Sequence, residues 1–424
     1  MRPDLRRVAT AALILAGVAT MIAVDVGHSL RPFSRGGGTA GEESPASLPV
    51  VLWHDNEGSG GRLVRNRFTM DLEVVRAEWR YLGAEAEGTE VLAFREAGRA
   101  PLNPGPLIRV PLGTRMTITV RNPLDRTLVV HGLGERWVAA MDSLVVPAGE
   151  TRRVSFTADV AGTFYYWGST TGATLFDRMF EDSQLTGAFI VDAPGERRVR
   201  ERIMVMSIFF AGVDNEGEPD FAMETFAING RPWPHTERLM YDVGDTVHWR
   251  VINTAQRTHP MHLHGFYFEL DAKGDMLRPG VVPPSQRRLL VTESMEAGET
   301  MRLRWVAERP GGWVFHCHLS WHVLANAAPG QFASAGEREN ATVFPHDHGD
   351  AHNHVVEGMG GLMMAVEIRD SAGRAAAVPP VRRLRLIVRS DSTAGTMRRF
   401  DFTFPAADGS VPTGPLLWPG PVLV

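Results

Sequence analysis

Hydrophobic and polar residues alternate in short runs along most of the chain, and Gly or Pro separates the runs. Clear examples are Met116–Val120, Arg152–Phe156, Thr246–Val251 and Thr300–Trp305. Alternation with a period of two is the pattern of a strand that buries one face. Turn signals between such short strands are typical of β-sandwiches and barrels. We therefore predict an all-β protein, with no long helix outside the N-terminus.

Two sequence segments occur twice, which indicates an internal repeat. Leu112–Asn122 resembles Val243–Asn253, and Gly162–Ser169 resembles Gly311–His318. Self-similarity at a fixed spacing is the signature of duplicated structural units. We predict two homologous β domains, at residues 49–195 and 196–372.

A third copy is expected to begin near the C-terminus. Pro419–Val424 resembles Pro104–Val110, and Arg383–Val388 and Phe400–Phe404 have the pattern of strands. A chain that ends inside an apolar strand leaves unpaired backbone groups. We expect residues 373–424 to be the start of a third, truncated domain; the alternative is a C-terminal strand that packs on the second domain.

The N-terminus has the pattern of an export signal. Three arginines precede an apolar run, Val8–Val24, and the Gly/Ser/Pro-rich stretch Ser34–Pro49 follows. The run is long for a signal-peptide core and short for a membrane-spanning helix. We expect residues 1–48 to be a signal or anchor segment with a flexible linker, and the protein to be exported to the periplasm or another extracytoplasmic space. The pattern leaves open whether residues 8–24 are cleaved or stay as a membrane anchor.

Composition narrows the function classes. The 424 residues are 44% hydrophobic and 22% charged, with a net charge of −5, which argues for globular domains and against a nucleic-acid partner. Cys317 is the single cysteine, so neither an intrachain disulfide nor a metal site built from cysteines alone can form. The chain has no phosphate-binding loop of the GxxxxGK[ST] type.

The second copy contains two clusters of metal-ligating residue types, His259-Pro-Met-His262-Leu-His264 and His316-Cys317-His318-Leu-Ser-Trp-His322. On a strand, residues i and i+2 share a face and residue i+1 points the other way. Cys317 is therefore expected on the opposite face from its two neighbours. With His259 and His322 it forms a set of two imidazoles and one thiolate, the ligand set of a blue-copper electron-transfer centre.

The other face is expected to gather His262, His264, His316 and His318, an all-imidazole set that suits copper. Cys317 is covalently adjacent to His316 and His318, which belong to the other site, so the segment His316–His318 would be a short electron path between the two sites. Zinc accepts the same ligand types but has no redox chemistry, so a paired arrangement would serve it no purpose.

A weak axial thioether ligand usually completes a blue-copper centre. Met359 is our candidate, because it lies just before an apparent strand, Leu362–Ile368. The alternative is that the methionines here fill gaps in the core. We interpret the stretch between His322 and Met359 as an insertion. It carries four further histidines that bind or relay copper, or else belong to a solvated polar loop; they are His346, His348, His352 and His354.

These motifs resemble the multicopper oxidases, the laccase-like family built from cupredoxin domains. The resemblance implies tandem cupredoxin-like Greek-key β-sandwiches or barrels, with copper as the cofactor. It implies a type 1 copper at Cys317 that takes electrons from a small reducing substrate such as a phenol or a metal ion. It also implies a trinuclear cluster that reduces dioxygen, with His262 as a type 2 ligand and type 3 ligands at His264, His316 and His318.

The first copy departs from the family pattern. Only His131 stands where the second copy has a His-x-His pair, and Trp167-Gly168-Ser169 stands where it has His316-Cys317-His318. We interpret the first copy as structural and His131 as an ordinary polar residue. The resemblance implies eight histidine ligands for the cluster, from four His-x-His motifs. Four of the eight are then missing here, so a truncated third domain, or failing that another subunit, would have to supply them.

Two other functions stay open at this point. One is a copper-binding electron-transfer protein that has a type 1 site and no oxygen chemistry. The other is an enzyme like the copper nitrite reductases, which share cupredoxin repeats and a type 1 site. We rank both below a multicopper oxidase, because the His-Cys-His arrangement suits a trinuclear cluster.

Overall fold

The computed structural model describes residues 47–137, 143–196, 199–213, 224–323, 360–370, 385, 387–391, 399–406 and 408–411. The chain divides into two units, residues 1–47 and 48–424, and every strand below belongs to the second unit. The described part is built from β-strands and short 3-10 helices, so the predicted all-β fold is confirmed.

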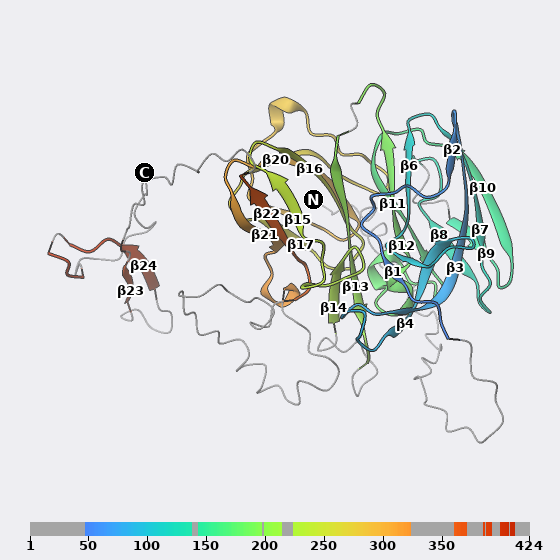
Figure 1. The fold of residues 1–424 in the computed structure, drawn as a ribbon, viewed down its shortest axis with the longest axis horizontal. Coiled ribbons are helices and arrows are strands. Elements are labelled where there is room, and N and C mark those ends of the chain that lie inside the picture. Colours follow the sequence, from blue (N-terminus) through green and yellow to red (C-terminus); the bar gives the residue numbers. More distant parts are fainter. Residues whose placement is uncertain are drawn as a thin grey trace, which may run out of the picture. The chain divides into compact units, whose positions relative to one another are not determined.

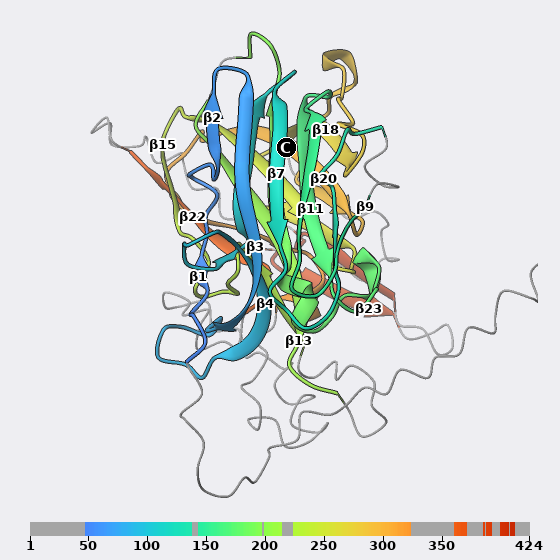
Figure 2. The ribbon, with the colours of Figure 1, turned by 90° about the vertical axis from the view of Figure 1, so that its right-hand side faces the viewer.

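The first copy forms two sheets. One has the order β1-β5-β4-β3-β7-β10, with β2 paired to β3; its strands are β1 (Leu52–Trp53), β2 (Arg62–Val64), β3 (Arg67–Trp79), β4 (Thr89–Glu96), β5 (Leu102–Asn103), β7 (Arg115–Arg121) and β10 (Thr151–Thr157). The other has the order β6-β12-β11-β8-β9; its strands are β6 (Gly105–Pro111), β8 (Leu128–His131), β9 (Ser143–Val146), β11 (Gly162–Ser169) and β12 (Thr186–Asp192). Figure 2 shows the long strand β3 beside β7, with which it pairs in parallel.

The second copy also forms two sheets. One has the order β14-β13-β16-β20-β18; its strands are β13 (Glu201–Phe210), β14 (Glu224–Ile228), β16 (Thr246–Asn253), β18 (Phe268–Asp275) and β20 (Glu299–Val306). The other, which we call the histidine sheet, has the order β15-β22-β21-β17-β19; its strands are β15 (Leu239–Asp242), β17 (His259–Leu263), β19 (Thr292–Met295), β21 (Gly311–Cys317) and β22 (Met363–Arg369).

The two copies have matching strand orders. The path β4-β3-β7-β10 corresponds to β14-β13-β16-β20, and β6-β12-β11-β8-β9 corresponds to the whole histidine sheet. The recurring sequence segments lie in β7 and β16, and in β11 and β21. The internal repeat is therefore confirmed. The domain boundaries after residues 48, 195 and 372 stay predictions, because residues 48–424 form one compact unit.

Strand β11 shows how the sequence determines the packing of the first copy. Its residues are apolar on both faces, and most of them are buried. Phe164 and Tyr166 point into the core between the two sheets of the copy, whereas Tyr165 and Trp167 belong to a separate apolar cluster. A strand that is apolar on both faces needs cover on both faces.

That second cluster joins the two copies. Tyr165 and Trp167 pack with Ile203 and Val205 of β13 and with Ile252 of β16. The Tyr165 hydroxyl also donates a hydrogen bond to the Gly298 carbonyl, at 3.1 Å. The second copy therefore covers the outer face of the sheet that contains β11. Figure 1 shows β11 on the side of the first copy nearest to β13 and β16.

The C-terminal region contains a hairpin of β23 (Ile387–Asp391) and β24 (Arg399–Thr403). The first of these begins four residues later than the strand we predicted, and the second begins one residue earlier. Pro419–Val424 and the N-terminal apolar run Val8–Val24 lie outside the described residues. Within the described ranges, no helix has the length and apolar character needed to cross a membrane.

Candidate metal centres

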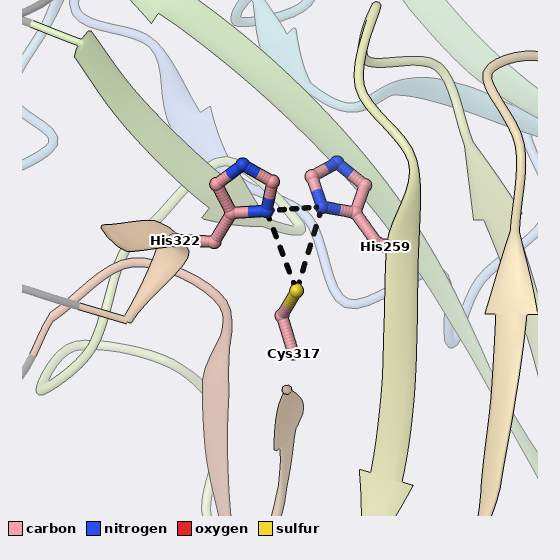
Figure 3. Close-up of side chains that lie close together, drawn as sticks. All are labelled: His259, Cys317 and His322. Carbon is pink, nitrogen blue, oxygen red and sulfur yellow. Dashed lines mark hydrogen bonds between the residues drawn. The ribbon is translucent and has the colours of Figure 1, made fainter. Parts of the chain in front are cut away.

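Three predicted ligand residues meet inside the second copy, and we call them the inner site. His259 begins β17, Cys317 ends β21, and His322 lies in the 3-10 helix η5 (Ser320–His322). The Cys317 Sγ lies 3.7 Å from His259 Nδ1 and 3.4 Å from His322 Nδ1, and the two Nδ1 atoms are 3.0 Å apart (Figure 3). Two neighbouring strands and the turn after one of them therefore bring the three donor atoms together.

The spacing of these donors fits a metal ion. Bonds of about 2.0 Å to nitrogen and 2.3 Å to sulfur, in a trigonal array, place the nitrogens about 3.5 Å apart and each nitrogen about 3.7 Å from the sulfur. The Nε2 atoms of His259 and His322 are buried with no hydrogen-bond partner among the described residues. Both rings thus turn their Nδ1 atoms toward the sulfur and toward each other, which suits ligands around a cation better than a hydrogen-bonded core.

Burial keeps the inner site neutral when no cation is present. His259, Cys317 and His322 are at most 1% exposed. Burial raises the pKa of the Cys317 thiol to about 11, and it lowers the pKa of His322 to about 4. The pKa of His259 is also lowered, by burial and then by His322. At neutral pH both imidazoles therefore have a free lone pair, as a metal ligand requires.

Apolar residues and backbone turns hold the inner site in place. The ring of Phe226 lies 4.3 Å from that of His322 and 5.2 Å from that of His259, measured between centroids. The Leu362 N–H donates to the His322 carbonyl, and the Cys317 N–H donates to the Leu362 carbonyl. The sequence did not indicate Phe226 or Leu362, because each comes from a segment distant from the ligand motifs.

Three more histidines meet on the opposite face, and we call them the outer histidine group: His262, His264 and His316. Their potential ligand atoms all lie within 4.8 Å of one another. The Nε2 atoms of His264 and His316 are 2.9 Å apart. Burial alternates along β17, with His259, Met261 and Leu263 buried and the residues between them partly exposed. The alternation along β17 and β21 thus places the two histidine sets on opposite faces, and their role as metal ligands stays a prediction.

His318 lies beside the outer histidine group without joining its tight cluster. Its ring centroid is 5.2 Å from that of His262 and 6.0 Å from that of His316. The residue follows the last position of β21 and is exposed. The structure thus brings three of the four predicted outer ligands together and leaves the fourth in ring contact with them.

Hydrogen bonds orient two of the outer rings. His262 Nδ1 lies 2.7 Å from the Thr292 hydroxyl, and His316 Nδ1 donates to the Cys317 carbonyl at 2.7 Å. Burial lowers the pKa of His262 and of His264, and it lowers the pKa of His316 to about 4. When Nδ1 of a neutral imidazole is engaged in this way, Nε2 is the nitrogen that can bind a metal.

The first copy has an aromatic stack where the second copy has ligands. The His131 ring stacks on Trp167 with centroids 4.1 Å apart, and the buried Arg178 guanidinium lies over Trp167 at 4.9 Å. The described residues contain no group of possible metal ligands in this copy. Met359, His346, His348, His352 and His354 lie outside the described residues, so their roles stay predictions.

Comparison with protein families gives two matches to this chain. One family model, described as multicopper oxidase, matches residues 211–330 and contains both ligand motifs. A second model with the same description matches residues 102–196, in the first copy. The two matches together span about half of the chain.

Several curated proteins are similar to parts of the chain. A probable nitrite reductase-hydroxylamine oxidoreductase fusion protein of Kuenenia stuttgartiensis is 26% identical over 309 residues, which cover 64% of this chain and 33% of that protein. The multicopper oxidase MmcO of Mycobacterium tuberculosis is 31% identical over 103 residues, or 24% of this chain and 19% of that protein. The chain spans a third or less of the length of these relatives.

Among solved structures, the blue copper oxidase from Nitrosomonas europaea has a similar fold. Its TM-score is 0.52 at 20% sequence identity, covering 71% of this chain and 86% of that one. The multicopper oxidase mgLAC also has a TM-score of 0.52, at 22% identity and the same coverage. At these identities the likeness concerns the fold, and it agrees with tandem cupredoxin-like β-sandwiches.

Proposed function

Because the chain belongs to the multicopper oxidase family, whose cofactor is copper, we propose that it is a copper-dependent oxidoreductase. In this proposal a small reducing substrate gives up single electrons at the inner site, and dioxygen is reduced at a cluster that includes the outer histidine group. One observation carries the proposal: Cys317 and His316 are consecutive in β21 and belong to the two different ligand groups.

The inner site has the donor set of an electron-transfer centre. Copper bound there would supply reversible one-electron chemistry. Cys317 keeps its proton in the free protein, since burial raises the pKa of its thiol to about 11. A cation that binds the sulfur favours loss of this proton to solvent. The buried Phe226 and Leu362 keep bulk water away from the three donors.

The protein chain itself connects the two sites. From the Cys317 sulfur, the covalent path to the imidazole of His316 runs through the backbone of two consecutive residues. The hydrogen bond from His316 Nδ1 to the Cys317 carbonyl, 2.7 Å long, shortens this path. His318, on the other side of Cys317, offers a second covalent path to the same face.

The outer histidine group needs ligands from another surface. The equivalent face of the first copy is covered by apolar residues of the second copy, including Ile203 and Val205. The face that carries His262, His264 and His316 is partly exposed instead. We propose that a further domain or another subunit packs there and completes the cluster.

The names of two relatives bear on the substrate, and the N-terminal sequence bears on the location of the protein. Relatives that match part of this chain are named Laccase-7, from Arabidopsis thaliana, and iron transport multicopper oxidase fio1, from Schizosaccharomyces pombe. We propose a phenol-like compound or a reduced metal ion as the electron donor. The N-terminal sequence supports export to an extracytoplasmic space, either as a cleaved protein or as one that residues 8–24 anchor in the membrane.

Nitrite reduction is a second candidate, because the Kuenenia stuttgartiensis relative that aligns with 64% of this chain has nitrite reductase in its name. The outer histidine group favours oxygen chemistry, because three clustered imidazoles with a fourth nearby suit more than one metal ion. Parallel assays of oxygen uptake and of nitrite loss, with the same reductant, separate the two candidates.

Copper content, visible absorption and EPR of the copper-loaded chain test the proposal. We expect an intense thiolate-to-copper absorption that Cys317→Ser abolishes while the far-ultraviolet circular dichroism stays unchanged. His131→Gln is the matched control, since it alters a half-buried histidine of the first copy and should leave the absorption intact. Absorption that persists in Cys317→Ser, or that is absent from the loaded wild type, contradicts the inner site.

Oxygen uptake tests the second half of the proposal. About one copper per chain with type 1 signals and no oxygen uptake indicates that this chain alone forms only the inner site. In that case, adding the domain or subunit that packs against the outer histidine group should start oxygen consumption. About four coppers per chain with oxygen uptake indicates that the chain completes the cluster by itself. Oxidation of the donor with loss of nitrite and without oxygen uptake favours the second candidate.

A further inference from the structure

Thr292 is the one residue with a side-chain hydrogen bond to His262 in the described part of the structure. It lies in β19, directly opposite His262 in the antiparallel pairing with β17. Residues opposite each other on paired strands share a face of the sheet. The hydroxyl of Thr292 therefore points to the same side as the outer histidine group, and its Oγ1 lies 2.7 Å from His262 Nδ1.

His262 is central in the cluster. Its ring centroid lies 4.9 Å from that of His264, 5.6 Å from that of His316 and 5.2 Å from that of His318. One ring nitrogen is engaged by Thr292, so the nitrogen left for a metal is Nε2. The orientation of His262 therefore decides whether this nitrogen meets the other imidazoles.

The tautomer of His262 matters as much as its orientation. A nitrogen that binds a metal must have no proton, so ligation through Nε2 requires the proton to be on Nδ1. A threonine hydroxyl can accept this Nδ1–H. Ligation through Nε2 and donation from Nδ1 to Thr292 therefore require the same tautomer, with the proton on Nδ1.

We propose that Thr292 is a positioning residue for the outer histidine group: its hydroxyl accepts a hydrogen bond from His262 Nδ1–H and presents Nε2 to the metal. This inference rests on the proposed function for the identity of the metal, whereas the hydrogen bond can be tested without any metal. Threonine suits the task because its β-branched side chain has few rotamers, which fixes the hydroxyl beside the ring.

The first test measures the tautomer in the metal-free protein. Nitrogen-15 NMR at pH 8 distinguishes a protonated Nδ1 from a protonated Nε2 on each imidazole. We expect His262 to have its proton on Nδ1 in the wild type and in Thr292→Ser, and to lose this preference in Thr292→Val. A wild-type His262 with its proton on Nε2 overturns the proposal.

The second test measures metal affinity. All variants carry Cys317→Ser, so that Cu²⁺ titrates the outer histidine group without the inner site. Loss of a hydrogen-bond partner behind a metal-binding histidine typically weakens binding 10–100-fold, and we expect a loss of about this size in Thr292→Val. Thr292→Ser keeps the hydroxyl and should bind nearly as tightly as the parent. Ser294→Ala is the matched control, because it removes a hydroxyl from the same strand.

The outcomes of the two tests separate the positioning role from the proposed function. An unchanged Cu²⁺ affinity in Thr292→Val, with unchanged circular dichroism, overturns the positioning role. An equal loss in Ser294→Ala overturns it too, since the effect would then be a general one of β19. If the parent does not bind Cu²⁺ at all, the outer copper site is wrong, and the tautomer measurement still decides whether Thr292 holds His262. Should Thr292→Val fail to fold, the wild-type tautomer and Thr292→Ser decide.

Discussion

A buried carboxylate, Glu201, connects the two copies, and its removal gives a prediction with a clear magnitude. Glu201 begins β13, and its side chain is 2% exposed. One carboxylate oxygen lies 2.8 Å from Arg109 Nη1 of the first copy, and the other lies 2.9 Å from Arg250 Nε of β16. A single carboxylate thus contacts two guanidinium groups at the junction of the copies.

When Glu201→Gln removes the negative charge, the two arginines retain different polar partners. Arg109 retains a bidentate contact with Asp192, at 2.8 and 3.0 Å. Arg250 is 3% exposed and retains the neutral hydroxyl of Thr163, at 2.7 Å. Breaking a buried ion pair from one side costs about 3–5 kcal/mol, since an uncompensated charge remains. Because one of the two arginines stays paired, we expect a loss near the lower value, about 3 kcal/mol.

Urea unfolding monitored by circular dichroism measures this loss. Glu90→Gln is the matched control: Glu90 pairs with Arg76 at 2.6 Å across two strands, and both side chains are about a third exposed. An exposed pair is worth less than about 1 kcal/mol, so the control should shift the midpoint little. The visible absorption of the folded, copper-loaded Glu201→Gln protein should equal that of the wild type. The reasoning is wrong if Glu201→Gln and Glu90→Gln lower the stability equally, or if the folded variant loses its absorption.

Three further outcomes are expected. Gly361 has φ +59°, and a Cβ there would lie 2.2 Å from the His322 carbonyl oxygen, so Gly361→Ala should destabilise the fold and shift the thiolate absorption, which visible spectroscopy measures. Burial, and then the charge of Asp55, raises the pKa of Glu237 to about 7. The native state therefore binds more protons than the unfolded state between about pH 4.5 and 7, so the free energy of unfolding should fall as pH rises through this window. Glu237→Gln should flatten that pH dependence, measured by urea unfolding at several pH values. His318→Ala should leave the thiolate absorption unchanged and alter the EPR signal of copper at the outer face, and loss of both signals together would contradict the separation of the faces.

The sequence predicted the faces of the ligand strands because those strands are regular. Alternation places Cys317 opposite His316 whenever β21 is extended, and the structure follows that rule. The repeat was equally visible, since Gly162–Ser169 and Gly311–His318 keep the same turn and aromatic positions. Both inferences use only local geometry, so neither needed any knowledge of packing.

The features that the sequence did not predict depend on how distant segments pair. Thr292 meets His262 because of the register between β17 and β19, thirty positions apart in the chain. His322 was expected beside Cys317 from its spacing in the motif, but its orientation could not follow from alternating faces, because it lies in a 3-10 helix. Phe226 reaches the inner site from β14, in the other sheet of the copy. Contacts across a core follow from side-chain packing, which a short motif does not encode.

The difference between the copies follows from what each outer face contacts. In the first copy this face packs against the second, so its position equivalent to His316 holds Trp167, which buries a large apolar area. In the second copy the same position holds an imidazole, and the described residues leave the face partly exposed. A histidine buried against Ile203 and Val205 would have lost its hydration without a partner, whereas an exposed tryptophan would leave apolar surface in water. The same scaffold therefore provides an internal interface in one copy and a ligand surface in the other, through the choice of side chains on a single strand.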